Sequence, residues 1–392
     1  MRPILRFVAA LALFCLVVPA AMAQDSQAPQ AAGKKIKAGF VYVGPVGDFG
    51  WTNAHDIARQ QMLKIFPWLE TTFVESVAEA DSARVIDRLV NEEKCDVIFT
   101  TSFGYMNDTA AAAARYPDRT FMHCSGYKRG PNLGTYFAEL YQAYYLNGLM
   151  AGALTKSGKL GYVAAHPIPE VVRHINAFAL GAREANPNAR VQVKWLFSWY
   201  DPAKAREAAE ALVAEGCDAL AFSEDSPAVI QVGEEHTQKG KPVFTFSHYS
   251  PMQKFGEHSV VSGQLVDWSV MYETILSSMY TGTWKPNDLW WLLKEGACKI
   301  GGAEGVQVNP AFVEPLKAVA ITDPVIGATN IYDLVLKRIA QMSEPTVLFD
   351  PFTGPIKDQA GTLRIKAGER ASHDTLWAID WFVEGVDATL PK

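Results

Sequence analysis

The sequence predicts an α/β protein built from two doubly wound lobes, and two observations support this. A segment near the N-terminus is repeated 122 residues later, and short continuous apolar runs alternate with stretches of helical period in both copies. Such an alternation is typical of parallel sheets that helices cover on both faces. The length of 392 residues is enough for two to three domains of about 150 residues each.

The first 23 residues predict a cleavable export signal. Two arginines precede an apolar run at 7–18, and residues 21–23 supply the small-residue pattern of a cleavage site. A lipid anchor is not expected, because Cys15 lies inside the apolar run and not at the cleavage point. We therefore expect a periplasmic protein that begins at Gln24 and carries a flexible leader over 24–35.

Composition limits the partners of the mature chain. The signal holds two arginines and no acid, so its removal takes the formal net charge from −6 to −8. This acidic balance argues against nucleic acid as a partner. Beyond the leader, no run of about 20 apolar residues predicts a membrane span. Four cysteines remain, and their spacing predicts buried structural thiols, with the pairing of Cys95 and Cys124 left open.

The internal repeat fixes the order of the elements. Lys37–Val41 resembles Lys159–Val163, and the same offset aligns Cys95-Asp96 with Cys217-Asp218. Four strand-like segments that match at one constant offset indicate a duplicated α/β unit of about 90 residues. In the first copy we expect strands at Ile36–Val43, Glu70–Val74, Asp96–Thr101 and Thr120–Ser125, and helices at Asn53–Phe66, Ala83–Glu92 and Asp108–Arg115.

The C-terminal part breaks the repeat. We expect a helix over Gln264–Gly282, a strand at 290–293, mostly helix over Asn309–Met342, a hairpin within 345–368 and a closing amphipathic helix over Asp374–Val386. The predicted organisation gives 36–135 and 255–282 to lobe 1, 136–254 and 283–345 to lobe 2, and 346–392 to a hairpin and helix that pack across the lobes.

A ligand site is predicted between the lobes, since ligands of such sheets lie beyond the carboxyl ends of the strands. The residues there are mainly aromatic with a few polar groups, and Tyr200 and Tyr249 belong to the same segments. This composition suits a flat ligand that forms hydrogen bonds. The candidate ligand-binding residues are Asp48, Trp51, His55, Ser102, Phe103, Tyr105, Tyr127, Glu170, Asn176, Trp199, Asp225, His248 and Trp268.

Two of these candidates have alternative roles. Asp48 either caps the first helix or accepts hydrogen bonds from ligand hydroxyls, and Trp51 either packs in the core or stacks on the ligand. The glycine-rich stretch Gly44–Asp56 lacks the lysine of a phosphate loop and the dinucleotide spacing. The histidines lack metal-ligand spacing, and no nucleophile motif is present, so no metal, cofactor or catalytic residue is predicted. Cleft carboxylates could still form the acid–base pair of a nucleoside or glycoside hydrolase.

Several motifs together resemble one family, the basic membrane protein family of periplasmic substrate-binding proteins, which includes purine nucleoside receptors of ABC transporters. The resemblance covers nearly the whole mature chain. It rests on Phe40–Pro45, Gly50-Trp51-Thr52, Thr101–Tyr105, Ile168–Val171, Asn176-Ala177-Phe178, Trp199–Pro202, Asp225–Ala228 and Phe352–Asp358.

The resemblance implies a type I periplasmic binding protein fold, with two lobes joined by three hinge crossovers and a ligand closed between them. It implies that an aromatic residue from each lobe sandwiches a purine. Carried onto this chain, Asp48, Trp51, Ser102 and Phe103 match lobe 1 contacts, and Asp225 matches a polar contact of lobe 2. The Gly-Trp-Thr loop replaces a Phe-Asn loop of the nucleoside receptors, which leaves nucleoside, nucleobase or another flat heterocycle open.

These expectations combine into one function. The protein is predicted to be a monomeric periplasmic receptor that captures a purine nucleoside or nucleobase by lobe closure and delivers it to an ABC permease. It is not expected to be an enzyme. The alternative is a secreted hydrolase that uses cleft carboxylates, and an added sensory role stays open.

Overall fold

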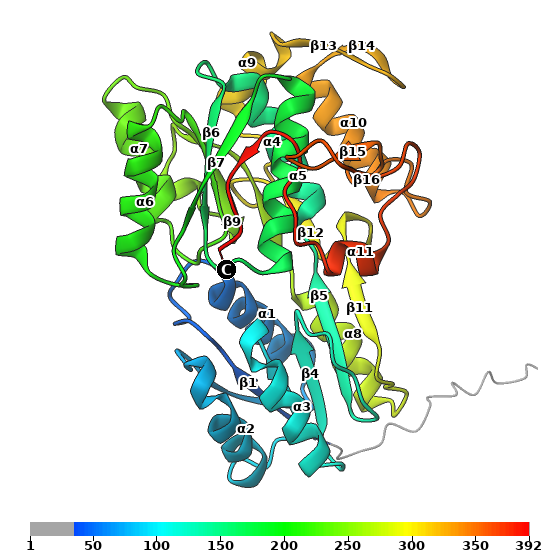
Figure 1. Ribbon diagram of the computed structural model, residues 1–392. Helices are drawn as coiled ribbons and strands as arrows, with labels where there is room; N and C mark the ends of the chain where they lie inside the picture. The colour runs from blue at the N-terminus through cyan, green and yellow to red at the C-terminus, as the bar shows by residue number, and fades with distance from the viewer. Residues whose placement is uncertain (1–34, 392) are drawn as a thin grey trace, which may run out of the picture. The chain divides into compact units, whose positions relative to one another are not determined.

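The computed structural model describes residues 35–391, so the predicted signal peptide and most of the leader lie outside the described residues. Two sheets organise this part of the chain (Figure 1). In lobe 1 the order is β11-β5-β4-β3-β1-β2, formed by Asp288–Trp291, Leu133–Ala138, Thr120–Cys124, Val97–Thr100, Ile36–Val41 and Leu69–Val74. In lobe 2 the order is β12-β10-β9-β8-β6-β7-β17, formed by Cys298–Ile300, Val260–Val266, Phe244–Tyr249, Ala219–Phe222, Lys159–Ala164, Arg190–Trp195 and Val386–Asp387.

The predicted repeat is confirmed in the strand order. The run β2-β1-β3-β4-β5 of lobe 1 recurs as β7-β6-β8-β9-β10 of lobe 2, with all neighbours parallel. The backbone repeats as well, because Ser76 after β2 and Phe197 after β7 have positive φ angles of 55° and 56°. Ser125 after β4 and Tyr249 at the end of β9 form a second such pair, at 54° and 60°.

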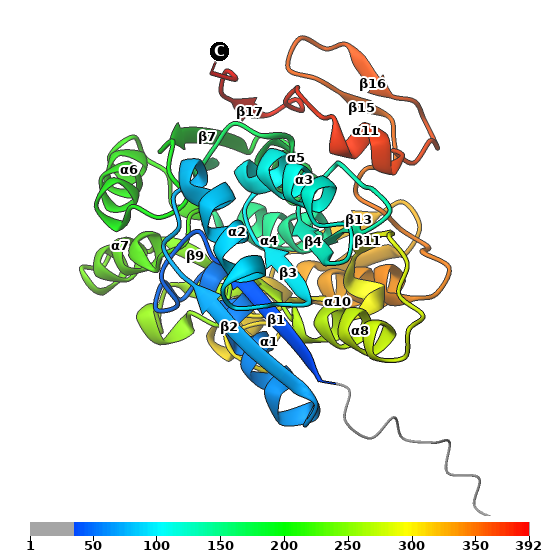
Figure 2. The same ribbon diagram turned by 90° about the horizontal axis from the view of Figure 1, so that it is seen from below.

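Helices cover both faces of each sheet, as the near-continuous apolar strands require. In lobe 1 (Figure 2), α1 and α8 lie on one face and α2 and α3 on the other. In lobe 2, α4 and α5 cover one face and α6 and α7 the other (Figure 1). These helices are α1 (Trp51–Ile65), α2 (Ser82–Asn91), α3 (Met106–Arg115), α4 (Tyr141–Leu154), α5 (Pro169–Ala185), α6 (Pro202–Ala214), α7 (Ala228–Gln238) and α8 (Ser269–Tyr280).

The helices α4 and α5 pack unusually closely, because glycines line their contact. A β-carbon at Gly181 would lie 2.0 Å from the carbonyl oxygen of Tyr145, and one at Gly148 would lie 2.1 Å from that of Phe178. Any side chain at these positions would push the helices apart. The close packing holds the first two turns of α5, which carry Glu170 and Arg173, beside the start of α4.

The chain passes between the two sheets three times, after Ala138, Val266 and Trp291, somewhat beyond the lobe limits expected at 135, 254 and 282. The three crossovers are tied together by hydrogen bonds. The amide of Glu139 donates to the carbonyl of Trp291 at 2.8 Å, and that of Asp267 donates to the carbonyl of Ala297 at 2.8 Å. The crossovers therefore form one connected hinge.

The C-terminal part differs from three sequence expectations. Gln264 belongs to β10, where it pairs with His248 of β9, so the helix expected from Gln264 begins only at Ser269. A hairpin of β13 (Ala320–Asp323) and β14 (Gly327–Asn330) separates α9 (Val313–Lys317) from α10 (Ile331–Ser343). Asp323 stabilises this turn, because its side chain accepts hydrogen bonds from the amides of Val325 and Ile326. In a continuous helix these amides would donate to backbone carbonyls instead.

The closing helix expected at Asp374–Val386 is also wrong beyond its first turn. Only α11 (His373–Trp377) is helical. Further along the predicted helix, Gly385 has a φ of 98°, and β17 then begins at Val386 and pairs with β7. The strand predicted around Trp290 is confirmed as β11, and the predicted hairpin as β15 (Ile356–Lys357) with β16 (Leu363–Ile365). The four cysteines of the described residues are buried free thiols. No helix in the range 35–391 is long and apolar enough to span a membrane.

Candidate ligand site between the lobes

A small cavity lies between the lobes at the carboxyl ends of the strands, with about 280 Å³ of space, part of which is open to solvent. Both lobes contribute to its wall, which is rich in aromatic rings. The lining residues are Val43, Trp51, Thr101, Ser102, Phe103 and Ser125 from lobe 1, and Glu170, Trp199, Asp225 and Tyr249 from lobe 2.

The loop that follows β1 closes this cavity against lobe 2. The amide of Trp51 donates to Asp225 Oδ1 at 3.4 Å, and Ser250 Oγ donates to the carbonyl of Gly50 at 3.3 Å. The ring of Phe49 meets that of Phe255 at a centroid distance of 5.1 Å. The structure therefore shows the lobes closed on one another.

Two of the lining residues are carboxylic acids that lack a cationic partner in the cavity wall, since none of the ten lining residues is lysine, arginine or histidine. Burial raises the pKa of Glu170 to about 8, helped by the charge of Glu139 and opposed by Arg173. Burial also raises the pKa of Asp225 well above its ordinary value, and the charges of Asp48 and Glu224 add to this effect. A buried acid of this kind is stabilised by a ligand that forms hydrogen bonds with it or places a positive charge beside it.

Asp48 caps α1 and does not line the cavity. Its Oδ1 accepts the amides of Gly50 at 2.7 Å and Asn53 at 2.9 Å, and its Oδ2 accepts the amide of Thr52 at 3.0 Å. These donors have no partner within the helix, so the buried carboxylate fixes where α1 begins. The capping role that the sequence left open is therefore present in the structure.

We expect the substitution Asp48→Ala to lower the free energy of unfolding by about 1–2 kcal/mol, because three buried amides lose their acceptor. Urea denaturation monitored by circular dichroism measures this loss. Asp201→Ala is the matched comparison in lobe 2, since Asp201 caps α6 by accepting the amide of Lys204 and pairs with the exposed ammonium group of the same residue. A smaller loss for Asp48→Ala than for Asp201→Ala would contradict this account.

Trp51 combines the two roles that the sequence left as alternatives. Its indole is 6% exposed and donates from Nε1 to the carbonyl of Thr101 at 2.6 Å, while the residue also lines the cavity. It meets the rings of Tyr249 and Trp268 edge to face, at 5.0 and 5.1 Å. The core therefore holds the Trp51 ring in a fixed position, where it forms part of the cavity wall.

The structure brings six of the thirteen predicted residues into the cavity wall, namely Trp51, Ser102, Phe103, Glu170, Trp199 and Asp225. Tyr127 lies at an adjoining hollow that shares Phe103 and Glu170 with the cavity. The other predicted residues lie elsewhere. His55 stacks on Trp268 at 4.2 Å and bonds to the hydroxyl of Tyr272, in the core between α1 and α8.

The remaining predicted residues have structural partners. Tyr105 donates to the carbonyl of Val77 at 2.6 Å, and His248 contacts Tyr144 and Gln264 inside lobe 2. Asn176 holds the C-terminal segment, because its side chain bonds to the carbonyl of Trp381 and the amide of Val383. Of the residues that the list omitted, Val43, Thr101 and Ser125 are small side chains at strand ends, and only their position after the strands could have indicated them.

A buried ion cluster lies at the hinge, next to the cavity. Glu139 forms an ion pair with Arg173 and accepts from His174 Nε2 at 2.9 Å, and all three side chains are fully buried. Burial raises the pKa of Glu139, but the charges of Arg173 and His174 outweigh burial and lower it to about 2. Arg173 also lies over the ring of Trp290, at 4.9 Å.

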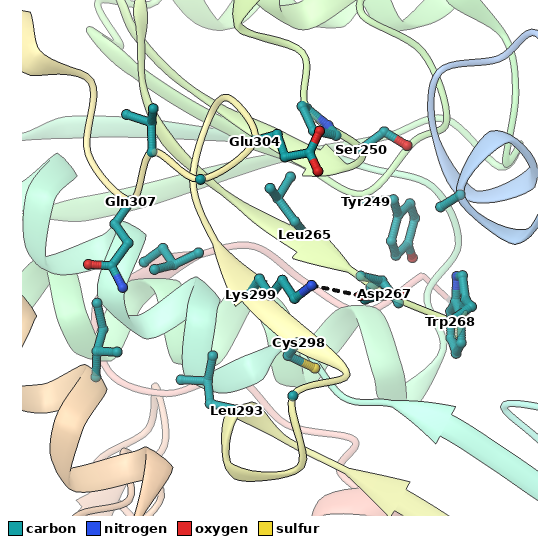
Figure 3. A pocket seen from close by; sticks show the side chains of 18 of the residues that line it. Tyr249, Ser250, Leu265, Asp267, Trp268, Leu293, Cys298, Lys299, Glu304 and Gln307 are labelled. Carbon is teal, nitrogen blue, oxygen red and sulfur yellow. Dashed lines mark hydrogen bonds and ion pairs between the residues drawn. The ribbon is translucent and has the colours of Figure 1, made fainter. Parts of the chain in front are cut away.

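A second, larger hollow lies beside the crossover Leu265–Trp268, with about 1910 Å³ of space that includes open solvent (Figure 3). Its wall includes the first turns of α1, the crossover Leu265–Trp268 and β12, and an ion pair joins Lys299 to Asp267 at 2.6 Å. Tyr249 and Trp268 also reach its edge. No group of His, Cys, Asp or Glu in residues 35–391 is arranged to hold a metal ion.

Comparison with known proteins agrees with this architecture. Residues 35–319 match the family model described as ABC transporter substrate-binding protein, PnrA-like. A purine-binding protein of Brucella abortus is 39% identical over 366 residues, which cover 92% of this chain and 95% of that protein. A putative ABC transporter glucose-binding protein of Haloferax volcanii is 42% identical over 264 residues, covering 67% of this chain and 66% of that protein.

Solved structures support the fold alone. A solute-binding protein of an ABC transporter from Aeropyrum pernix has a TM-score of 0.67 at 16% identity, covering 87% of this chain and 95% of that chain. One from Conexibacter woesei has a TM-score of 0.59 at 17% identity, covering 80% and 100%. The type I periplasmic binding fold predicted from the sequence is thereby confirmed. The chain belongs to the family of PnrA-like substrate-binding proteins of ABC transporters.

Proposed function

We propose that this protein is a periplasmic receptor that binds a purine nucleobase or nucleoside between its lobes and delivers it to an ABC permease. The observation that carries the proposal is the cavity between the lobes, with aromatic rings from both lobes and two buried acids in its wall. The identity of 39% with a purine-binding protein supports the same ligand class.

Phe103 and Trp199 are the proposed pair that sandwiches the base. They come from opposite lobes, both line the cavity, and both are only partly buried, so each ring has a face to offer. Stacking against rings favours a flat heterocycle over a sugar, which carries more hydroxyls and no aromatic face.

Binding and closure are coupled in this proposal. A ligand that touches both lobes stabilises the closed arrangement, which the permease then recognises. The contacts of Gly50 and Trp51 with lobe 2 exist only when the lobes are closed. The receptor therefore needs no covalent chemistry, and a monomer suffices.

Isothermal titration calorimetry with adenine, adenosine and glucose tests the proposal. We expect binding of adenine or adenosine and none of glucose, and we expect Phe103→Ala and Trp199→Ala each to weaken binding by about tenfold or more. Phe197→Ala is the control, since Phe197 is 58% exposed, precedes Trp199 by two residues and does not line the cavity. Equal losses for all three variants would argue against the sandwich.

The same incubation distinguishes the hydrolase alternative. If Glu170 and Asp225 acted as an acid–base pair, adenosine would be converted to free adenine, which chromatography detects. Turnover would replace the receptor proposal, whereas unchanged adenosine that protects the protein against thermal unfolding supports it.

A further inference from the structure

Glu170 is a buried acid that nothing in its surroundings neutralises. It lies in the first turn of α5, its side chain lines the cavity, and the residue is 9% exposed. Within residues 35–391, its hydrogen-bonding neighbour is Tyr249, whose hydroxyl donates to Oε1 over a long 3.5 Å. No other hydrogen bond reaches the Glu170 carboxyl within these residues, and the residue lines the cavity where a ligand would bind.

The nearest cation cannot serve as a partner. Arg173 lies one turn further along α5, but it donates to Glu139 from Nη2 and to the carbonyl of Leu376 from Nη1. The groups that act electrostatically on Glu170 are Arg173 on its own helix, Glu139 at the start of α4, Tyr144 on α4, Cys124 on β4, Tyr162 on β6, Tyr249 on β9 and Asp225 after β8. These are acids and neutral groups around one arginine that is already paired, so an ionised Glu170 would be an uncompensated buried charge.

We propose that Glu170 recognises its ligand as a neutral carboxylic acid, whose hydroxyl donates to a ring nitrogen while its carbonyl oxygen accepts the adjacent N–H. This proposal rests on the proposed function, because a purine edge places a ring acceptor beside an N–H donor. A carboxylic acid matches such an edge with one donor and one acceptor. A carboxylate has only acceptors and would face the lone pair of the ring nitrogen.

The electrostatics of the site agree with this role. Burial raises the pKa of Glu170 to about 8, with Glu139 adding to the effect and Arg173 opposing it. At neutral pH the neutral form therefore predominates. A bound acceptor would stabilise that form further, so the ligand and the proton would bind together.

The substitution Glu170→Gln tests the proposal, because an amide keeps one donor and one acceptor and cannot ionise. With adenine as the probe, we expect wild-type affinity to hold up to about pH 8 and then fall by about tenfold per pH unit. Glu170→Gln should bind within about threefold of the wild type at pH 7, and the ratio of the two affinities should shift toward the variant above pH 8. Because adenine ionises to the same extent with both proteins, the change of this ratio with pH reports the ionisation of Glu170.

A loss of more than about tenfold in Glu170→Gln at pH 7, with no pH-dependent change in the ratio, would show that Glu170 acts as an anion. Infrared difference spectra of the ligand-free proteins give a second readout. In the wild-type spectrum minus the Glu170→Gln spectrum, where the bands of the other buried acids cancel, we expect a carbonyl band of a protonated acid that disappears as pH rises through about 8.

The two readouts separate this proposal from the proposed function. If adenine binds while the infrared band is missing at pH 7, the receptor function stands and the neutral acid is overturned. If the band is present while neither adenine nor adenosine binds at any pH, the purine function fails, and the pairing with a purine edge fails with it. Circular dichroism melting confirms that the variant is folded.

Discussion

Replacing Glu139 with alanine is expected to lower the free energy of unfolding by about 3–5 kcal/mol, because it leaves the charge of Arg173 buried without a partner. Arg173 and Glu139 are both fully buried at the hinge, and water cannot reach the guanidinium group that the substitution would strand. The amide of Tyr141 would also lose Glu139 Oε1, its acceptor at 2.9 Å. Urea denaturation of the wild type and the variant measures the difference.

The matched control is Arg190→Ala, which removes an ion pair with Asp387 at the edge of lobe 2, where both side chains are about half exposed. We expect it to change stability by less than about 1 kcal/mol, as exposed pairs do. The double variant Glu139→Gln/Arg173→Met should recover much of the loss, since it removes both charges. A loss below 1 kcal/mol in Glu139→Ala would show that the buried arginine finds another partner.

The effect of Glu139 should depend on pH in a defined direction. Its pKa lies at about 2 in the folded protein, below the ordinary value of 4.5, so its ionised form stabilises the fold above about pH 4.5. This contribution is lost as pH falls from about 4.5 toward 2. The stability difference between the wild type and Glu139→Ala should therefore be constant near neutral pH and shrink in acid.

The fold was predictable because the internal repeat reveals the strand order that both lobes share. One constant offset placed four strands of each lobe in the same order, and the continuous apolar strands indicated parallel sheets, which the structure confirms. The errors lie where the chain leaves the repeat. The sequence predicts a helix from Gln264 onward, yet Gln264 lies in β10 and pairs with His248 of β9 in a buried sheet. Long-range pairing of this kind overrides local propensity.

The sequence predicted which loops form the site better than it predicted which side chains line the cavity. Every lining residue lies at a strand end, in the loop that follows it or in the first turn of the next helix, as the rule for parallel sheets anticipates. The direction of each side chain depends on backbone conformation that the sequence does not reveal. Asp48 turns back to bind the amides of α1, and His55 lies one helical turn beyond Trp51, where it faces α8. Asp48 lies in the loop before α1 and His55 lies within α1, and neither side chain lines the cavity.

Gly50 offers a direct test of closure, since it lies where the lobes touch. A β-carbon at this position would lie 2.7 Å from the Cα atom of Asp225, closer than real contacts of this kind. The obstructing atoms are backbone, so no side-chain rotation relieves the clash. The separated lobes would not meet it, because the two residues belong to different lobes. Gly50→Ala should therefore act on the closed state alone.

We expect Gly50→Ala to weaken adenine binding by about a hundredfold, because each closed complex must carry an overpacking cost of up to about 3 kcal/mol. Small-angle scattering should show a larger radius of gyration for the variant than for the wild type when adenine is present. Gly47→Ala is the control in the same loop, since a β-carbon there meets no atom within 4 Å. Wild-type affinity in Gly50→Ala would mean that the ligand binds without the contact between Gly50 and Asp225, and closure would then have to be located elsewhere in the cleft.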